Sequence, residues 1–473
     1  MMELPRLASS HTTRTAATPR RWRIAAVGTL VAGFAAGDVA ARRAGRRSAA
    51  LGLVAGGATA IAVVALGRAE RRRGVEVRAV VPVRSAAGPY LSVIVPARDE
   101  ARVIGRIVAD LAAQDHRAVD GTPLFDVLVV DDRSTDGTGT HARLAADRAG
   151  LGAALRVMER RGRGLADGKG AALAWVPLGA CRGEAVVVLD ADARIGPRFL
   201  TMIADLVAAG APALTARRRM IAAPGSRLAR VQDDEQTLDG AIAAARTEIG
   251  GSAELRGDGM VVRRDLLERV GGWSSIALTE DLELSSRLAA RARVCVSWTA
   301  SAEVLEEAAA SPAKLWRQRL RWAEGSIRRS FEHGPAVLLT SGLPLRARAD
   351  ASIYGAQLAV PPVVLGALVG GLVRRRPWAL AAILGAYATF SASVTWAVLD
   401  AREPTGEPGR GRARLPPVER LIRSVQAALF GSIWIAAVPA AFIRLAVARG
   451  TLLFERTPHG EVGRPETETE RAA

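Results

Sequence analysis

The sequence contains few lysines, cysteines and histidines, and each shortage limits what the protein can be. Lys169 and Lys314 are the only lysines, so arginine supplies nearly all of the 65 basic residues. Two cysteines, Cys181 and Cys295, cannot build a disulfide framework. The five histidines are scattered and show none of the spacings that bind zinc. No internal repeat is visible. We expect no cleavable signal peptide, because residues 1–23 are polar and basic and precede an apolar run too long for one.

Apolar residues and positive charge are abundant instead. The chain is 49% hydrophobic and carries a net charge of +18. A basic protein that binds nucleic acid does not need long uncharged apolar runs, whereas arginines beside such runs are typical of the cytoplasmic ends of membrane spans. We therefore expect a membrane as partner and no nucleic acid.

Five apolar segments are long enough to cross a hydrocarbon core of roughly 30 Å. They are residues 24–41, 48–66, 351–373, 378–399 and 425–447. The first contains Asp38 and many small residues. The alternative is that some are buried helices of a globular core, although such long apolar runs are unusual there. The loop 42–47 holds four arginines, so either this hairpin is partly interfacial or the preference for positive charge in the cytoplasm is locally broken.

A polar region at 88–334 lies between the two apolar groups. Residues 91–95, 127–130 and 186–189 are short apolar runs typical of buried strands, and residues 104–111 repeat apolar side chains at helical spacing. Strands that alternate with helices predict an α/β fold with a mostly parallel sheet and helices on both faces. Ligands of such sheets bind outside the carboxyl ends of the strands, which is where the acidic residues fall.

Acidic pairs follow two of these predicted strands. Asp131 and Asp132 come after the second, and Asp190 and Asp192 come after the third. Residues i and i+2 of an extended chain point the same way, so Asp190 and Asp192 would repel each other unless a cation lies between them. Mg²⁺ and Mn²⁺ bind to such carboxylates together with substrate phosphates. A D-x-D sequence is also common in solvated turns, and that alternative stays open.

Two further motifs place charge at predicted helix starts. Glu280 and Asp281 precede the periodic segment 282–290, where the helix dipole favours acidic residues as caps. The same position lets a carboxylate act as a general base on a hydroxyl. Lys169, flanked by two glycines, can approach phosphates, but the spacing is not that of a Walker motif.

In their order, these motifs resemble the family 2 glycosyltransferases. The resemblance covers about residues 91–325 and includes the opening strand and loop at 93–100, Val130-Asp131-Asp132, Gly168-Lys169-Gly170, Asp190-Ala191-Asp192 and Thr279-Glu280-Asp281. Gln318-Arg319-Leu320-Arg321-Trp322 then matches the Q-x-x-R-W motif of the membrane-embedded branch, which includes cellulose, chitin and hyaluronan synthases and several lipid glycosyltransferases. Arg133 departs from the pattern, because many members have glycine there.

The resemblance implies a GT-A fold, the nucleotide-diphospho-sugar transferase fold, with flanking transmembrane helices. The nucleotide pocket would be lined by Glu100, Asp132, Lys169 and Asp190, with Gln318 and Arg321 closing over the donor diphosphate. Asp192, with Asp190, would hold Mg²⁺ or Mn²⁺, and Asp281 would be the catalytic base. Glu280 and Trp322 would bind the acceptor. Gln318, Arg321 and Trp322 stand at i, i+3 and i+4, so a helix would present them on one face.

The predicted function is an inverting, metal-dependent transfer of sugar from a nucleotide sugar, expected to be a UDP-sugar, to a hydroxyl of a polysaccharide or lipid. The enzyme would be a multi-pass protein of the bacterial cell membrane with a cytoplasmic catalytic domain. The predicted parts are a basic tail at 1–23, a membrane hairpin at 24–66, the GT-A domain at 88–334, transmembrane helices at 351–447 and a disordered tail at 455–473.

Two alternatives remain. A polyprenyl-phosphate sugar transferase has a phosphate acceptor that needs no strong base, and it usually lacks Q-x-x-R-W. A membrane scaffold or transporter component with an inactive transferase domain would be expected to have lost its D-x-D or its base, and both are retained here.

Overall fold

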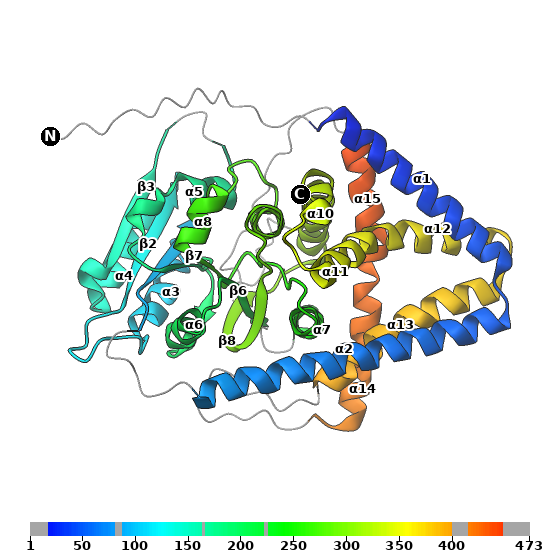
Figure 1. Cartoon of the computed structure of the whole chain (residues 1–473), viewed down its shortest axis with the longest axis horizontal. Coiled ribbons are helices and arrows are strands. Elements are labelled where there is room, and N and C mark those ends of the chain that lie inside the picture. The colour runs from blue at the N-terminus through cyan, green and yellow to red at the C-terminus, as the bar shows by residue number, and fades with distance from the viewer. Residues whose placement is uncertain (1–17, 81–87, 163–165, 222–225, 400–414, 448–473) are drawn as a thin grey trace, which may run out of the picture.

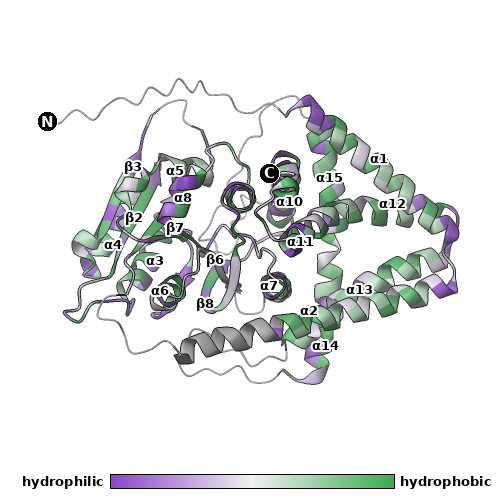
Figure 2. Ribbon diagram, in the orientation of Figure 1, coloured by the Kyte–Doolittle hydropathy of each residue, from purple (hydrophilic) through white to green (hydrophobic). Residues whose placement is uncertain are grey.

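The computed structural model of the protein describes residues 18–80, 88–162, 166–221, 226–399 and 415–447. The predicted tail at 455–473 and residues 1–17 of the predicted N-terminal tail lie outside the described residues. The described part combines a sheet covered by helices with a group of long helices to one side (Figure 1). Most residues of these long helices are hydrophobic, as Figure 2 shows.

In the described residues, eight strands form one sheet in the order β3-β2-β1-β4-β7-β6-β8-β5. The strands are β1 (Leu91–Ala97), β2 (Phe125–Asp132), β3 (Leu155–Arg160), β4 (Ala185–Val188), β5 (Arg194–Ile195), β6 (Ala213–Ile221), β7 (Met260–Arg263) and β8 (Ser297–Glu307). The three apolar runs predicted as strands correspond to β1, β2 and β4. These strands and β3 are parallel, as predicted. The sheet is mixed beyond them, because β7 is antiparallel to both β4 and β6.

Both faces of the sheet are covered by helices, as predicted. Val93 and Val95 of β1 face one side, with α3 (Ile104–Ala112), α4 (Thr138–Arg148) and α6 (Phe199–Ala208). Ile94 faces the other side, with α5 (Lys169–Trp175), α8 (Arg264–Val270) and α9 (Glu280–Arg287). The continuous apolar run of β1 follows from this double burial, because successive side chains of a strand point to opposite faces.

The remaining helices connect the sheet to the apolar part. They are α1 (Arg20–Arg43), α2 (Arg46–Val80), α7 (Arg227–Glu248), α10 (Pro312–Leu339), α11 (Leu345–Ala356), α12 (Val360–Val373), α13 (Pro377–Leu399), α14 (Pro417–Gly431) and α15 (Ile433–Val447). Short 3₁₀ segments lie at Gly152–Ala154, Leu178–Ala180 and Gln357–Ala359, and a π-helical turn at Leu288–Ala292 continues α9.

Five stretches of the described chain are long and apolar enough to cross a membrane. They are Arg20–Arg43, Arg46–Leu66, Leu345–Val373, Pro377–Leu399 and Pro417–Val447, and they overlap the five predicted segments. The third consists of α11, a 3₁₀ turn and α12, and the fifth consists of α14 and α15. In each stretch, no more than 33% of an apolar window of 18 residues is buried inside the molecule, which argues against their being core helices.

Two helical hairpins, α1–α2 and α12–α13, pack together through glycine. α1 lies along α12, and α2 lies along α13 (Figure 1). A Cβ atom added to Gly366 would lie 2.6 Å from the Cα atom of Phe34, and one added to Gly52 would lie 2.5 Å from the carbonyl oxygen of Ala382. Small residues therefore let the helix backbones approach closely, as in helix pairs within membranes.

Candidate active site

A cleft of about 450 Å³ opens where the carboxyl ends of β1, β2 and β4 meet the starts of α5 and α9 and one side of α10. All of the residues predicted to form the site line this cleft: Glu100, Asp132, Lys169, Asp190, Asp192, Glu280, Asp281, Gln318, Arg321 and Trp322. Parallel strands bring Asp132 and Asp190 together because their carboxyl ends open at the same edge of the sheet, and α5, α9 and α10 supply the helical residues. The individual roles of the residues stay predictions.

Lys169 begins α5 and forms an ion pair with Asp190 at the floor of the cleft. Its Nζ atom also donates a hydrogen bond to the carbonyl oxygen of Gly257 at 2.5 Å. Burial acts to lower the pKa of Lys169, but the charges of Asp190, Glu280 and Asp258 outweigh burial and raise this pKa. The lysine therefore stays protonated and neutralises part of the carboxylate cluster.

Asp132 ends β2 and is held by two arginines. Arg160 Nη1 donates to its Oδ1 at 2.7 Å, and Arg133 Nε donates to the same oxygen at 2.9 Å. Arg133 has a positive φ of 60°, in the left-handed region where glycine has little strain. This conformation explains why glycine suits the position, and it also lets Arg133 reach Asp167 at 2.7 Å.

Glu280 and Asp281 lie in the first turn of α9. The Leu282 N–H donates to Asp281 Oδ1 at 2.8 Å, so this oxygen makes a local contact at the helix start. The other oxygen, Oδ2, lies 3.6 Å from the position that a Cβ atom on Gly257 would occupy in the cleft. Burial, reinforced by the charge of Asp281, raises the pKa of Glu280. The capping and base interpretations of Asp281 are thus compatible, since each uses a different oxygen.

Negative charge dominates the cleft wall. Its described lining contains eleven carboxyl side chains but only four basic ones. No group of three or more His, Cys, Asp or Glu side chains among the described residues is arranged to hold a metal ion by itself. Asp190 and Asp192 can still supply two carboxylates, which suits a Mg²⁺-type ion that takes its remaining oxygens from phosphates and water.

The family comparison covers the part of the chain that forms this cleft. Residues 88–325, just over half of the chain, match the family described as glycosyltransferase-like family 2. The chain belongs to this family. The match confirms the predicted enzyme class and the GT-A-like fold class with flanking apolar helices. Membership of the Q-x-x-R-W branch stays a prediction.

Curated relatives of this family 2 glycosyltransferase carry the name β-monoglucosyldiacylglycerol synthase. The protein from Trichormus variabilis is 27% identical over 307 residues, which cover 64% of this chain and 63% of the relative. The Synechocystis protein is 29% identical over 303 residues, which cover 64% of this chain and 62% of the relative. The match thus spans less than two thirds of the length of these relatives.

Solved structures of glycosyltransferases also resemble the chain. A mannosyltransferase from Pyrobaculum calidifontis, in complex with GDP-Man and Mn²⁺, is 21% identical, with a TM-score of 0.49 over 83% of this chain and 98% of that one. The glucosyl-3-phosphoglycerate synthase of Mycobacterium tuberculosis, in complex with Mg²⁺ and UDP, is 21% identical, with a TM-score of 0.34 over 57% of this chain and 84% of that one.

Several charged residues of the glycosyltransferase cleft were not among the predicted site residues, and three of them, Asp258, Arg218 and Glu306, make contacts that bear on the site. Asp258 accepts a hydrogen bond from the Asp190 N–H at 3.0 Å, and burial together with the Asp190 charge raises its pKa. Arg218 Nη2 donates to Glu306 at 2.8 Å, and both residues line the cleft. Arg218 and Glu306 lie on the neighbouring strands β6 and β8, and nothing in their local sequence indicates that these strands pair.

Arg319 was also missed as a site residue, although it lies inside the Q-x-x-R-W motif. Its side chain is fully buried on α10 and forms an ion pair with Glu235 of α7. Its Nη1 donates to Gln318 Oε1 at 2.7 Å, and its guanidinium lies 4.4 Å from the ring centre of Trp322. Arg319 therefore orients two cleft residues from behind. Its position next to Gln318 was the one available signal.

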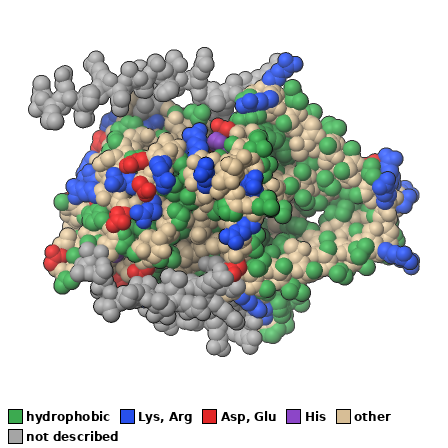
Figure 3. Space-filling view, viewed as in Figure 1, with side chains coloured by type: hydrophobic (Ala, Val, Ile, Leu, Met, Phe, Trp, Pro, Cys, Tyr) green, Lys and Arg blue, Asp and Glu red, His purple; other side chains and the backbone are tan. Residues whose placement is uncertain are grey.

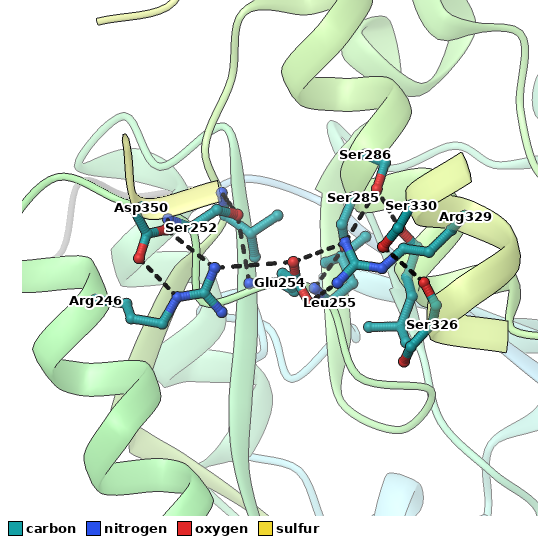
Figure 4. A network of polar contacts seen from close by, with 12 residues as sticks. Arg246, Ser252, Glu254, Leu255, Ser285, Ser286, Ser326, Arg329, Ser330 and Asp350 are labelled. Carbon is teal, nitrogen blue, oxygen red and sulfur yellow. Dashed lines mark hydrogen bonds and ion pairs between the residues drawn. The ribbon is translucent and has the colours of Figure 1, made fainter. Parts of the chain in front are cut away.

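A buried ionic network connects the cleft to the apolar helices (Figure 4). Glu254, three residues before Gly257 of the cleft, accepts from Arg329 of α10 at 2.7 and 2.9 Å. Arg246 of α7 donates to Asp350 of α11 at 2.9 and 3.0 Å and lies 3.8 Å from Glu254. Since α11 begins the third apolar stretch, these pairs fix the apolar helices relative to the cleft.

We expect Gly325→Ala to lower transferase activity, because Gly325 of α10 packs directly on Thr279. An added Cβ atom would lie 2.9 Å from the Thr279 Cβ and still closer to its Oγ1 and Cγ2 atoms. The clash would push α10 away from the start of α9 and separate Trp322 from Asp281. Initial rates and thermal unfolding of the purified variant should both decline.

Gly355→Ala is the matched control, because Gly355 is a helical glycine with nothing within 4 Å of the added Cβ atom. Alanine inside a helix is more stabilising than glycine by about 0.5–1 kcal/mol, so this variant should keep its activity and should not lose stability. Equal rates for the two variants would contradict the packing argument.

Proposed function

We propose that the protein is an inverting, metal-dependent glycosyltransferase that moves a sugar from a UDP-sugar to a hydroxyl of a membrane lipid. One observation carries the proposal: α10 lines the cleft with Gln318, Arg321 and Trp322 while its other side packs against apolar helices. An acceptor that lies in a membrane could therefore reach the cleft without leaving the lipid.

The packing behind α10 supports a lipid acceptor over a soluble one. Leu320, Ala323 and Ile327 of α10 share a buried cluster with Ala26 of α1 and with Phe442 of α15. Both α1 and α15 belong to stretches long enough to cross a membrane. The names of the curated relatives specify a diacylglycerol lipid. We therefore propose a lipid such as diacylglycerol as the acceptor, and the membrane-embedded Q-x-x-R-W branch as the subgroup.

The proposed chemistry is a single displacement. The acceptor hydroxyl gives its proton to Asp281, and its oxygen forms a bond to the anomeric carbon of the donor sugar. The bond from that carbon to the diphosphate breaks, and the nucleoside diphosphate leaves. Attack from the face opposite the leaving group inverts the anomeric configuration, so an α-linked donor gives a β-linked product. Asp281 lies in the first turn of α9, where the positive end of the helix dipole interacts favourably with a carboxylate.

The charge of the cleft supports metal dependence. A diphosphate would be repelled by a wall with eleven carboxyl groups and four basic ones unless a divalent cation accompanied it. We propose that Asp190 and Asp192 hold Mg²⁺ or Mn²⁺, which would neutralise the developing charge of the leaving group. Arg321 would contribute a bidentate contact to phosphate oxygens.

We further propose that the apolar stretches cross the bacterial cell membrane and that the catalytic domain at 88–334 faces the cytoplasm. The proposed membrane parts are the hairpin at 24–66 and the helices at 351–447. This orientation gives the cleft access to nucleotide sugars, which are cytoplasmic. It also places the α10 side of the domain against the membrane surface.

The proposal can be tested with purified full-length protein in detergent, given a panel of UDP- and GDP-sugars, Mg²⁺ or Mn²⁺, and diacylglycerol or a polyprenyl phosphate. We expect sugar from one UDP-donor to appear on diacylglycerol, with a β-linkage in the NMR spectrum of the product. Transfer to polyprenyl phosphate alone would support the alternative class of transferase. An α-linked product would refute inversion.

A further inference from the structure

The far end of the two helical hairpins carries a dense group of arginines. Seven exposed arginines lie at the α1–α2 and α12–α13 turns: Arg42, Arg43, Arg46, Arg47, Arg374, Arg375 and Arg376. Figure 3 shows basic side chains gathered at this end of the molecule, opposite the sheet. These seven residues are called the arginine tip.

Specific contacts join the two turns into one surface. Asp38 accepts a hydrogen bond from Arg42 at 2.7 Å and also pairs with Arg374, which comes from the other hairpin. The Arg46 guanidinium lies 5.1 Å from the ring centre of Trp378, again across the two hairpins. These contacts hold the two turns, which carry all seven arginines, next to each other.

Positive charge is in large excess at this surface. Asp38 is the one acidic residue in the segments 20–66 and 360–399, so six of the seven positive charges are uncompensated within these segments. Within the described part of the chain, the guanidinium groups of Arg43, Arg47, Arg375 and Arg376 form no ion pair with a carboxylate. No carboxylate among the described residues therefore neutralises these four charges.

The surroundings of the arginine tip are apolar. Leu51 is 68% exposed, Leu372 70% and Val373 74%, and all three lie within a few residues of the arginines. The stretch Arg46–Leu66 has 21 residues, which as a helix rise roughly 30 Å, the thickness of the hydrocarbon core. If the hairpins cross the membrane as proposed above, the arginine tip lies at the headgroups of the far leaflet.

We propose that the arginine tip binds the phosphate groups of anionic phospholipids in the far leaflet. The ligand must combine a negative headgroup with an apolar body, because the surface combines guanidinium groups with exposed aliphatic side chains. Arginine binds phosphate oxygens through paired N–H groups. Positive charge is normally disfavoured on the side of the membrane away from the cytoplasm, and lipid phosphates would offset that cost here. This inference rests on the proposed membrane crossing.

The test is lipid retention by full-length protein in detergent, measured by native mass spectrometry with equimolar phosphatidylglycerol and phosphatidylcholine. The tip variant replaces four unpaired arginines: Arg43→Gln, Arg47→Gln, Arg375→Gln and Arg376→Gln. The control removes the same charge from exposed sites on the catalytic domain: Arg148→Gln, Arg161→Gln, Arg198→Gln and Arg269→Gln. We expect the wild type and the control to retain phosphatidylglycerol preferentially, and the tip variant to lose about fivefold or more of that preference.

Two results would overturn the proposal, and they differ in what else they overturn. Carbonate extraction of membranes shows whether each protein is embedded in the bilayer. If the proteins are embedded but the tip variant keeps the wild-type lipid preference, or the wild type has none, the lipid site alone is wrong. If carbonate releases all three proteins, the membrane crossing is wrong and the lipid site with it. Neither measurement uses the sugar donor, so the transfer reaction is tested separately.

Discussion

Replacing Asp281 with alanine should lower kcat by about 10²–10⁴-fold, the usual contribution of a general base. Asp281 lies at the start of α9. One of its carboxylate oxygens accepts a hydrogen bond from the Leu282 N–H, and the other faces Gly257 in the cleft. Loss of the carboxylate would leave the acceptor hydroxyl without a proton acceptor. Donor binding should change little, because Lys169, Asp190 and Arg321 remain in place. Single-turnover rates and nucleotide titration by calorimetry measure the two effects separately.

Asp265→Asn provides the control for this experiment. Asp265 also lies in the first turn of a helix, α8, but its side chain is 62% exposed and lies outside the cleft. A general loss of activity from removing an acidic residue at a helix start would appear in both variants. Turnover at the wild-type rate in the Asp281 variant would show that another group takes the proton.

Replacing Asp192 with asparagine should lower kcat/KM for the donor by about 10²–10³-fold, since metal-assisted stabilisation is worth several kcal/mol. Asp192 is buried in the turn between β4 and β5, among carboxylates that would otherwise repel the diphosphate. Dialysis of the wild type against EDTA should have a similar effect, and added Mn²⁺ or Mg²⁺ should restore the wild type more completely than the variant. Donor consumption at varied metal concentration measures both.

Asp205→Asn on α6, outside the cleft, is the matched control and should need no more metal than the wild type. Full activity of the wild type after EDTA treatment would rule out metal dependence. In that case Lys169, Arg218 and Arg321 would have to neutralise the diphosphate without help. If the Asp192 variant kept wild-type kinetics and still required metal, residues other than Asp192 would have to hold the metal.

Several of the predicted site residues could be singled out from local sequence pattern, whereas Glu100, Gln318, Arg321 and Trp322 were assigned through the family resemblance. Asp132 and Asp190 follow apolar runs that could be read as buried strands, and Lys169 and Asp281 precede runs that could be read as helices. The rule that ligands bind at the carboxyl ends of parallel strands predicted the place of Asp132 and Asp190, and the resemblance to family 2 glycosyltransferases implied that Lys169 and Asp281 share their cleft. These signals extend over only a few residues, so they can be recognised without knowing what packs against them.

The residues that were missed depend on contacts between distant segments. Arg218 and Glu306 meet because β6 pairs with β8, and Asp258 reaches Asp190 because β7 runs antiparallel beside β4. The positive φ of Arg133 likewise follows from the turn that the surrounding structure imposes. No periodicity in the sequence specifies strand order, since short buried strands look alike whichever neighbour they pair with.

The sequence by itself determined which carboxylates and basic residues follow predicted strands or precede predicted helices. It also determined which stretches are apolar enough to cross a membrane. Side-chain charge and apolar periodicity depend only on residues that are neighbours in the sequence, so they can be recognised without a structure. Only the tertiary structure decided that Arg319 supports Trp322 from behind, that Gly325 sets the approach of α10 to Thr279, and that two arginine-rich turns form one surface. Those arrangements arise from packing between segments far apart in the chain, where shape and close approach, and not local pattern, select the neighbours.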